Sequence, residues 1–115
     1  MSLARTWLFA FVITCLLELP IVLLATRGAE PRWQRIVGVA LLAQVLTHPL
    51  VWFAFPALPV LTLEGRFWLS ELFAWLAEAA LYASLLRGVS LWRGVGVSGV
   101  ANALSLTAGL VFAGD

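Results

Sequence analysis

The chain has 115 residues, of which 63% are hydrophobic and only 11% are charged, with a formal net charge of +1. A soluble domain is about half apolar and about a quarter charged, and a small one buries only about 60% of the surface of its chain. This composition therefore excludes a soluble globular fold and predicts that apolar surface faces lipid. The small net charge gives no reason to expect a nucleic acid partner. The single cysteine excludes an intrachain disulfide.

Four apolar segments follow one another along the chain, each long enough to cross ~30 Å of hydrocarbon as a helix of about 20 residues. We place them near Thr6–Ala25, Ile36–Pro59, Phe67–Leu86 and Val95–Ala113. The connecting segments are short, so consecutive helices are expected to be antiparallel neighbours. Because backbone groups in lipid must be hydrogen-bonded internally, the sequence predicts an all-α membrane protein. Residues 1–115 are expected to form one domain, an up-down bundle of four antiparallel transmembrane helices.

The arginines predict how the chain is oriented in the membrane. The N-terminus and the second connecting segment carry one arginine each, Arg5 and Arg66. The first and third connecting segments carry Arg27, Arg32, Arg35, Arg87 and Arg93. Because arginine is enriched in cytoplasmic loops, we expect these two segments in the cytoplasm and both termini on the outer side. The interpretation is a multi-pass protein of a cell membrane, namely a bacterial inner membrane.

Each predicted span carries a strongly polar side chain near its middle. These are Glu18 in the first span, His48 in the second, Glu78 in the third and Asn102 in the fourth, with Gln44 one turn before His48. A charge at the bilayer centre costs roughly 2.5–3.5 kcal/mol on insertion scales, so we expect these groups to face one another inside the bundle. At least one carboxylate is expected to be protonated there, because desolvation and a neighbouring like charge both disfavour the charged form.

Further polar residues extend this predicted site along the helix faces. Glu71 lies seven residues before Glu78 and Tyr82 lies four residues after it, so all three share one face of the third span. Ser105 lies three residues after Asn102 on the fourth span. The residues predicted to bind a substrate or a proton are Glu18, His48, Glu71, Glu78, Asn102, Ser105, Gln44 and Tyr82.

Two prolines are expected to loosen the backbone beside the site. Pro49 follows His48 directly and cannot donate a hydrogen bond to the carbonyl of Val45, which predicts a kink in the second span. Pro20 does the same to the carbonyl of Leu16 in the first span. A freed carbonyl at membrane depth is tolerated where protein or trapped water satisfies it. The prolines therefore favour a cavity at this depth.

Three functions fit this pattern. A site with titratable groups between kinked helices favours proton-coupled transport, or transport of an ion or a small solute. A chain with so little sequence outside the lipid also fits an accessory subunit of a larger membrane complex. The third interpretation is an intramembrane metal-binding protein or enzyme. Its ligands for Zn, Mn or Fe would be Glu18, His48, Glu71 and Glu78.

Catalysis is the least favoured of these interpretations. The chain has a single histidine, and the sequence contains no Glu-x-x-His, HExxH or CxxC motif and no visible nucleophile–base pair. We therefore predict no catalytic residue and no cofactor, with a divalent metal as the one open alternative. The expected partners are the lipid bilayer and either further copies of the chain or other membrane proteins.

Overall fold

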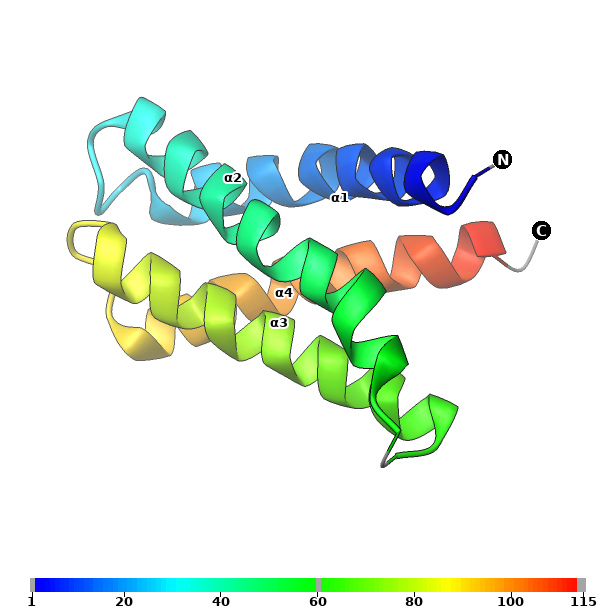
Figure 1. Ribbon diagram of the computed structural model, residues 1–115. Helices are drawn as coiled ribbons and strands as arrows, with labels where there is room; N and C mark the ends of the chain where they lie inside the picture. Colours follow the sequence, from blue (N-terminus) through cyan, green and yellow to red (C-terminus); the bar gives the residue numbers. More distant parts are fainter. Residues whose placement is uncertain (1, 60, 114–115) are drawn as a thin grey trace.

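The computed structural model describes residues 2–59 and 61–113, which form four long helices joined by short connections (Figure 1). The helices are α1 (Leu3–Thr26), α2 (Trp33–Pro49), α3 (Leu63–Leu85) and α4 (Leu91–Ala113). The described part of the chain contains no strand. The prediction of an all-helical chain is therefore confirmed.

Three stretches of helix are long and apolar enough to cross a membrane, namely Leu3–Thr26, Trp33–Ala57 and Leu91–Val111. Helix α3 has 23 residues and is comparable in length. It is not among these three stretches, and three glutamates and one arginine lie within it. Length and composition thus support membrane spans for three of the four predicted segments.

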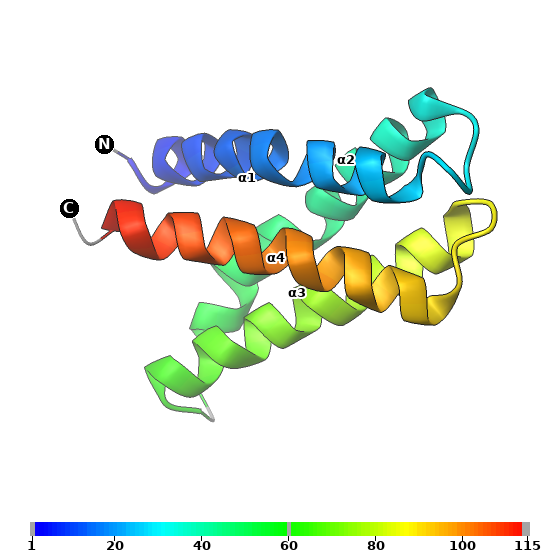
Figure 2. The same ribbon diagram turned by 180° about the vertical axis from the view of Figure 1, so that it is seen from behind.

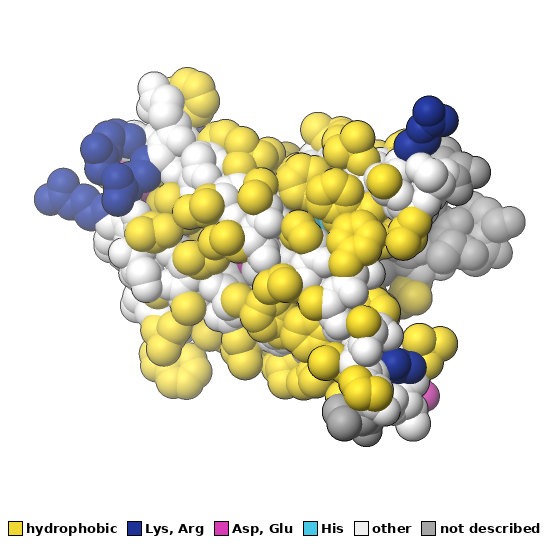
Figure 3. Space-filling model, viewed as in Figure 1, with side chains coloured by type: hydrophobic (Ala, Val, Ile, Leu, Met, Phe, Trp, Pro, Cys, Tyr) yellow, Lys and Arg dark blue, Asp and Glu magenta, His cyan; other side chains and the backbone are white. Residues whose placement is uncertain are grey.

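Large hydrophobic side chains cover the outside of the helices. On α1, for example, Leu8, Phe9 and Leu16 are 53%, 66% and 64% exposed. Figure 3 shows hydrophobic side chains over most of the body of the molecule. Contiguous exposed apolar surface of this extent is unusual on a monomeric soluble protein. It fits helices that are surrounded by hydrocarbon.

The four helices form a ring in which each one packs against two others. Helix α1 contacts α2 and α4, and α3 contacts the same two helices. Consecutive helices run back and forth, so the two chain termini lie together at one end (Figures 1 and 2). At that end the α1–α4 pair and the α2–α3 pair diverge in both views. At the opposite end, which carries the α1–α2 and α3–α4 connections, the two pairs lie closer together.

Polar residues in the connections begin the helices. Ser2, Thr62 and Ser90 precede α1, α3 and α4, and each hydroxyl accepts a hydrogen bond from the backbone N–H three residues later, at 3.2, 3.0 and 3.1 Å. These caps explain why each of the three helices begins three or four residues before the apolar segment predicted from the sequence. In the α3–α4 connection Gly88 has a φ of 73°, a left-handed conformation that favours glycine.

The second predicted span changes its helix type beyond Pro49. Regular α-helix ends at this proline, a π-helix follows over Leu50–Ala54, and a 3-10 helix continues over Phe55–Ala57. A proline removes a backbone donor from the helical ladder, and local π or 3-10 turns can satisfy the backbone groups that it frees. The expected irregularity is thus present as a change of helix type, and the span ends at Ala57 rather than at Pro59.

Exposed arginines gather at the end with the α1–α2 and α3–α4 connections, which we call the arginine end (Figure 3). They are Arg27, Arg32, Arg35, Arg87 and Arg93. Two of them tie neighbouring helices together. The Nε of Arg35 donates to the carbonyl of Leu85 at 2.8 Å, and Nη2 of Arg93 donates to the carbonyl of Ala25 at 2.7 Å. Buried Glu30 lies 3.3 Å from the same Nε of Arg35. These cations cap the C-terminal carbonyls of α3 and α1.

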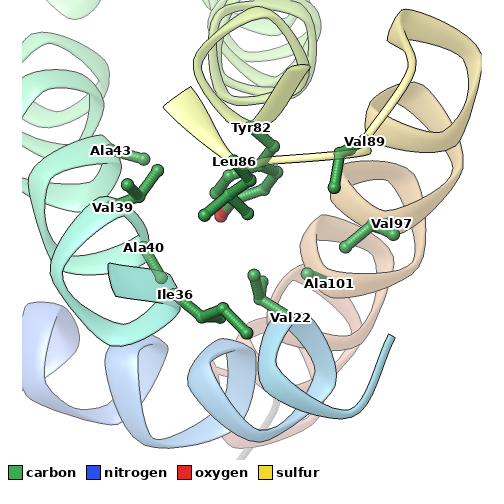
Figure 4. Packing of buried hydrophobic residues seen from close by; sticks show 10 residues of the cluster. All are labelled: Val22, Ile36, Val39, Ala40, Ala43, Tyr82, Leu86, Val89, Val97 and Ala101. Carbon is green, nitrogen blue, oxygen red and sulfur yellow. The ribbon is translucent and has the colours of Figure 1, made fainter. Parts of the chain in front are cut away.

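The apolar core fills the bundle next to the arginine end (Figure 4). Its buried members come from all four helices and the α3–α4 connection, and they are Val22, Ile36, Val39, Ala40, Ala43, Tyr82, Leu86, Val89, Val97 and Ala101. Helices α3 and α4 approach closely here. A Cβ atom added to Gly94 would lie 2.6 Å from the carbonyl oxygen of Ala79, so only glycine allows this distance.

Candidate functional site

A cluster of polar side chains lies in the middle of the bundle, directly beyond the apolar core. Each helix contributes one member: Glu18 from α1, Gln44 from α2, Glu78 from α3 and Asn102 from α4. The first three are 2%, 3% and 1% exposed. Hydrogen bonds join all four. The structure therefore brings together four of the residues that the sequence predicted to share a site.

The amide of Gln44 connects the two glutamates. Its Nε2 donates to Oε1 of Glu18 at 3.0 Å and to Oε1 of Glu78 at 3.3 Å. The second oxygen of Glu78 accepts from Nδ2 of Asn102 at 2.9 Å, and the same Nδ2 donates to the carbonyl of Ser98 at 2.8 Å. Because a primary amide carries two N–H hydrogens, both amides have donors for all of these bonds. The two carboxyl groups thus share one donor.

Two hydroxyl groups each stand between a carboxyl oxygen and a backbone carbonyl. Oγ1 of Thr47 lies 3.2 Å from Oε1 of Glu78 and 2.9 Å from the carbonyl of Ala43. Oγ of Ser105 lies 2.9 Å from Oε2 of Glu18 and 3.2 Å from the carbonyl oxygen of Asn102. A hydroxyl has one hydrogen but can also accept, so it can donate to only one of its two oxygen neighbours at a time.

His48 lies at the edge of the cluster in an aromatic environment. The rings of Trp7, Phe11 and Trp52 have centroids 6.2, 5.5 and 6.1 Å from the imidazole centroid. Its Nε2 lies 3.5 Å from Oγ1 of Thr14, and its buried Nδ1 has no hydrogen-bond partner among the described residues. His48 is 9% exposed. Within the described chain it makes no hydrogen bond to either glutamate of the cluster.

A cavity of about 310 Å³ lies against the polar cluster, and we call it the carboxylate cavity. Seven of the eight predicted site residues line it: Glu18, Gln44, His48, Glu71, Glu78, Asn102 and Ser105. The eighth, Tyr82, belongs instead to the apolar core, where its hydroxyl is buried without a hydrogen-bond partner in the described chain. Glu71 is half-buried in the wall of the cavity.

The carboxylate cavity extends away from the arginine end. Besides the polar cluster it is lined by Ala10 on α1, Trp52 in the π-helix that follows α2, Phe67 on α3 and Gly109 on α4. On every helix these residues lie between the cluster and the end that carries the chain termini. The apolar core lies on the other side of the cluster. The site is therefore sealed toward the arginine end and hollow toward the end where the helices diverge.

Hydrogen bonds, and not ion pairs, satisfy the carboxyl groups of the cluster. Among the residues that the structure describes, no arginine or lysine lines the carboxylate cavity. In the described part of the chain, the ion pairs belong to Glu30 at the arginine end, with Arg32 and Arg35. Two carboxyl groups that share a donor without a nearby cation disfavour ionisation of both at once. This arrangement suits groups that gain and lose protons.

The residues predicted as metal ligands lie around the same cavity but are not gathered into a ligand set. Among residues 2–59 and 61–113, no three or more His, Cys, Asp and Glu side chains converge closely enough to hold a metal ion. Glu18 and Glu78 instead accept hydrogen bonds from amides, and His48 is surrounded by aromatic rings. The metal-site interpretation stays a prediction, which elemental analysis of the purified protein can test.

Sequence reasoning missed several residues that line the carboxylate cavity. Thr47 lies three residues after Gln44, and Thr14 lies four residues before Glu18, so helical spacing alone could have identified both. Phe67 gave no such signal, because an aromatic residue near the end of an apolar segment also fits an anchor at the membrane interface.

Comparison with known proteins does not assign the chain to a family. No family model, no curated protein and no solved structure matches the chain. The function is therefore inferred from the site itself.

Proposed function

We propose that this chain is a small membrane transporter that moves protons, or a small charged solute coupled to protons, through the carboxylate cavity. One observation carries the proposal. Glu18 and Glu78, from two different helices, are 2% and 1% exposed, share the amide of Gln44 and line a cavity of about 310 Å³. Buried carboxyl groups at membrane depth are costly and typically mark an ion or proton pathway.

In this proposal all four helices cross the membrane as an antiparallel bundle. Helix α3 packs against α2 and α4, and the carboxyl group of Glu78 accepts hydrogen bonds from both of those helices. The carboxyl group of Glu78 is therefore directed away from lipid. This removes most of the free-energy cost of placing that group at the bilayer centre. The arginine end faces the cytoplasm and both termini lie on the outer side.

The two hydroxyl groups support a role in proton binding. When Glu78 is ionised, Thr47 donates to it. When Glu78 is protonated, its O–H donates to Thr47, and the threonine hydrogen turns to the carbonyl of Ala43, 2.9 Å away. Ser105 can serve Glu18 in the same way. Each carboxyl group thus has a hydrogen-bond partner in both protonation states, so neither state leaves a buried polar atom unpaired.

The shape of the bundle supports alternating access. The carboxylate cavity extends toward the outer side, and the apolar core separates the polar cluster from the arginine end. A transporter must close the outer path and open this core to release its cargo inside. The pair α1–α4 and the pair α2–α3 already diverge at the outer end (Figure 2). Rocking of one pair against the other is the motion that the arrangement supports.

The test measures charge movement in protein-containing liposomes on a solid support after a jump in external pH. We expect wild-type protein to give currents that Glu78→Gln reduces by tenfold or more. The matched control is Arg87→Gln, which removes an exposed charge at the arginine end, away from the carboxylate cavity, and should leave the currents within about twofold. Equal currents from Glu78→Gln and wild type, or no current from a folded wild-type protein, would contradict the proposal.

A further inference from the structure

A second and larger cavity adjoins the carboxylate cavity on its outer side. This outer chamber has a volume of about 590 Å³. It shares four lining residues with the carboxylate cavity, which are Val51, Trp52, Phe67 and Glu71. The two cavities therefore meet along a common wall. Together they have the size and partly apolar lining that are typical of small-molecule sites.

The outer chamber lies beside the irregular backbone that follows α2 in the chain. Its walls are Val51 and Trp52 of the π-helix, Phe55 and Pro56 of the 3-10 helix, and the first half of α3. Most of these side chains are apolar or aromatic. A pathway for protons alone needs only a narrow thread of water or hydroxyl groups. An apolar chamber of this volume is suited to a larger apolar group.

We infer that the two cavities together bind an organic cation with an apolar body, an inference that rests on the proposed function and names its substrate class. The cationic group lies in the carboxylate cavity near Glu78 and Glu18. The apolar body lies in the outer chamber, against Trp52 and Phe67. A cation so placed meets acidic and aromatic groups, both of which attract positive charge.

The distribution of charge favours a cation over an anion or a neutral molecule. Glu71 and Glu78 lie seven residues apart on one face of α3, and both line the carboxylate cavity together with Glu18. Among the described residues, Glu64 and Arg66 carry opposite charges in the outer part of the wall of the outer chamber, and Nη1 of Arg66 donates to the carbonyls of Pro56 and Leu58. In the carboxylate cavity an anion would meet three carboxyl groups and no arginine among the described lining residues.

His48 supplies an independent sign that the cavity accommodates a ligand. It lines the carboxylate cavity, it is 9% exposed, and its Nδ1 has no partner among the described residues. Buried polar atoms are nearly always paired in folded proteins. Trp52 stacks near the same imidazole, with an interplanar angle of 21°, and also forms the wall between the two cavities. These two side chains therefore connect the polar cluster to the aromatic wall.

The experiment is calorimetric titration of the purified, detergent-solubilised protein with three soluble probes. Benzyltrimethylammonium carries a cation and an apolar body, tetramethylammonium carries only the cation, and benzenesulfonate joins an apolar body to an anion. We expect the first probe to bind saturably and at least tenfold more tightly than either of the others. Equal affinity for benzenesulfonate, or no saturable binding of benzyltrimethylammonium, would overturn the inference.

Two substitutions locate the bound probe. Trp52→Leu should weaken the binding of benzyltrimethylammonium at least fivefold while changing that of tetramethylammonium less than twofold, because it removes the aromatic wall and leaves the carboxyl groups in place. Glu78→Gln should weaken the binding of both cationic probes. The matched control is Trp92→Leu, since Trp92 is 82% exposed near the arginine end, and this variant should bind like wild type. Unchanged affinity in Trp52→Leu would show that the apolar body lies elsewhere and would overturn the placement.

The titrations and the pH-jump currents separate the two proposals. Wild-type currents without cation binding would overturn the substrate class and leave proton movement standing. Cation binding that depends on Glu78, in a protein that gives no currents, would overturn transport and leave the binding site standing. Elution as a single species in size-exclusion chromatography confirms that each variant is folded before it is titrated.

Discussion

Among the described residues, Gln44 is the one whose amide donates hydrogen bonds to both Glu18 and Glu78, so replacing it tests the polar cluster directly. Gln44→Leu keeps the side-chain volume nearly constant and removes the hydrogen bonds of 3.0 and 3.3 Å. Hydrogen bonds between membrane helices contribute about 0.6 kcal/mol on average and at most about 1.7 kcal/mol. Two such bonds, one of them long, predict that the free energy of unfolding falls by about 1–3 kcal/mol.

The assay is reversible unfolding in mixed micelles with increasing sodium dodecyl sulfate, followed by helical circular dichroism. The matched control is Gln34→Leu, because Gln34 lies on the same helix with its side chain exposed. A double-mutant cycle of Gln44→Leu with Glu18→Gln isolates the contact between these two residues. The expected coupling free energy is about 0.6–1.7 kcal/mol.

If Gln44 bridges the glutamates, its replacement must lower the free energy of unfolding more than the replacement of Gln34 does. The double-mutant cycle must also show a coupling free energy. Unfolding free energies of Gln44→Leu and wild type that agree within about 0.3 kcal/mol, together with zero coupling, would refute the hydrogen-bonded cluster. The carboxylate pair would then lose the shared donor on which the proposed function rests.

Two further predictions concern helix packing and orientation. Gly94→Ala should lower the free energy of unfolding by about 1–3 kcal/mol, because its Cβ would lie 2.6 Å from the α3 backbone. Gly96→Ala, with nothing within 4 Å of the added carbon, should be neutral or stabilising by up to about 1 kcal/mol; equal effects in the same unfolding assay would contradict the close approach. In a cysteine-free background, Leu61→Cys should react with an impermeant maleimide on intact cells and Gly28→Cys only after the cells are opened. The reverse pattern would show that the arginine end lies outside.

The composition and the spacing of polar residues determined the class of this protein. Backbone groups in lipid must be satisfied internally, and apolar segments of about 20 residues do this as helices. The high cost of a lipid-facing carboxylate was enough to predict that Glu18 and Glu78 turn inward. These inferences hold because they depend on the solvation of single groups and on the fixed rise of a helix, which are local properties.

The partners within the site depended on the tertiary structure. Which side chain meets which is set by the rotation and separation of helices, and these follow from contacts such as the one at Gly94. Sequence reasoning therefore could not foresee that Gln44 bridges the glutamates, or that His48 lies among aromatic rings. It also could not foresee that Tyr82, on the same face as Glu78, lies in the apolar core.

The two cavities likewise arise only from packing. The sequence predicted that Pro49 disturbs the second span, but the width of the outer chamber depends on how the π-helix and the 3-10 helix behind it lie against α3. The side to which the polar cluster is open depends on where the apolar core closes the bundle. Solvation energies determined that polar groups gather inside this protein, whereas the packing of the helices decided their partners and the direction from which the cluster is reached.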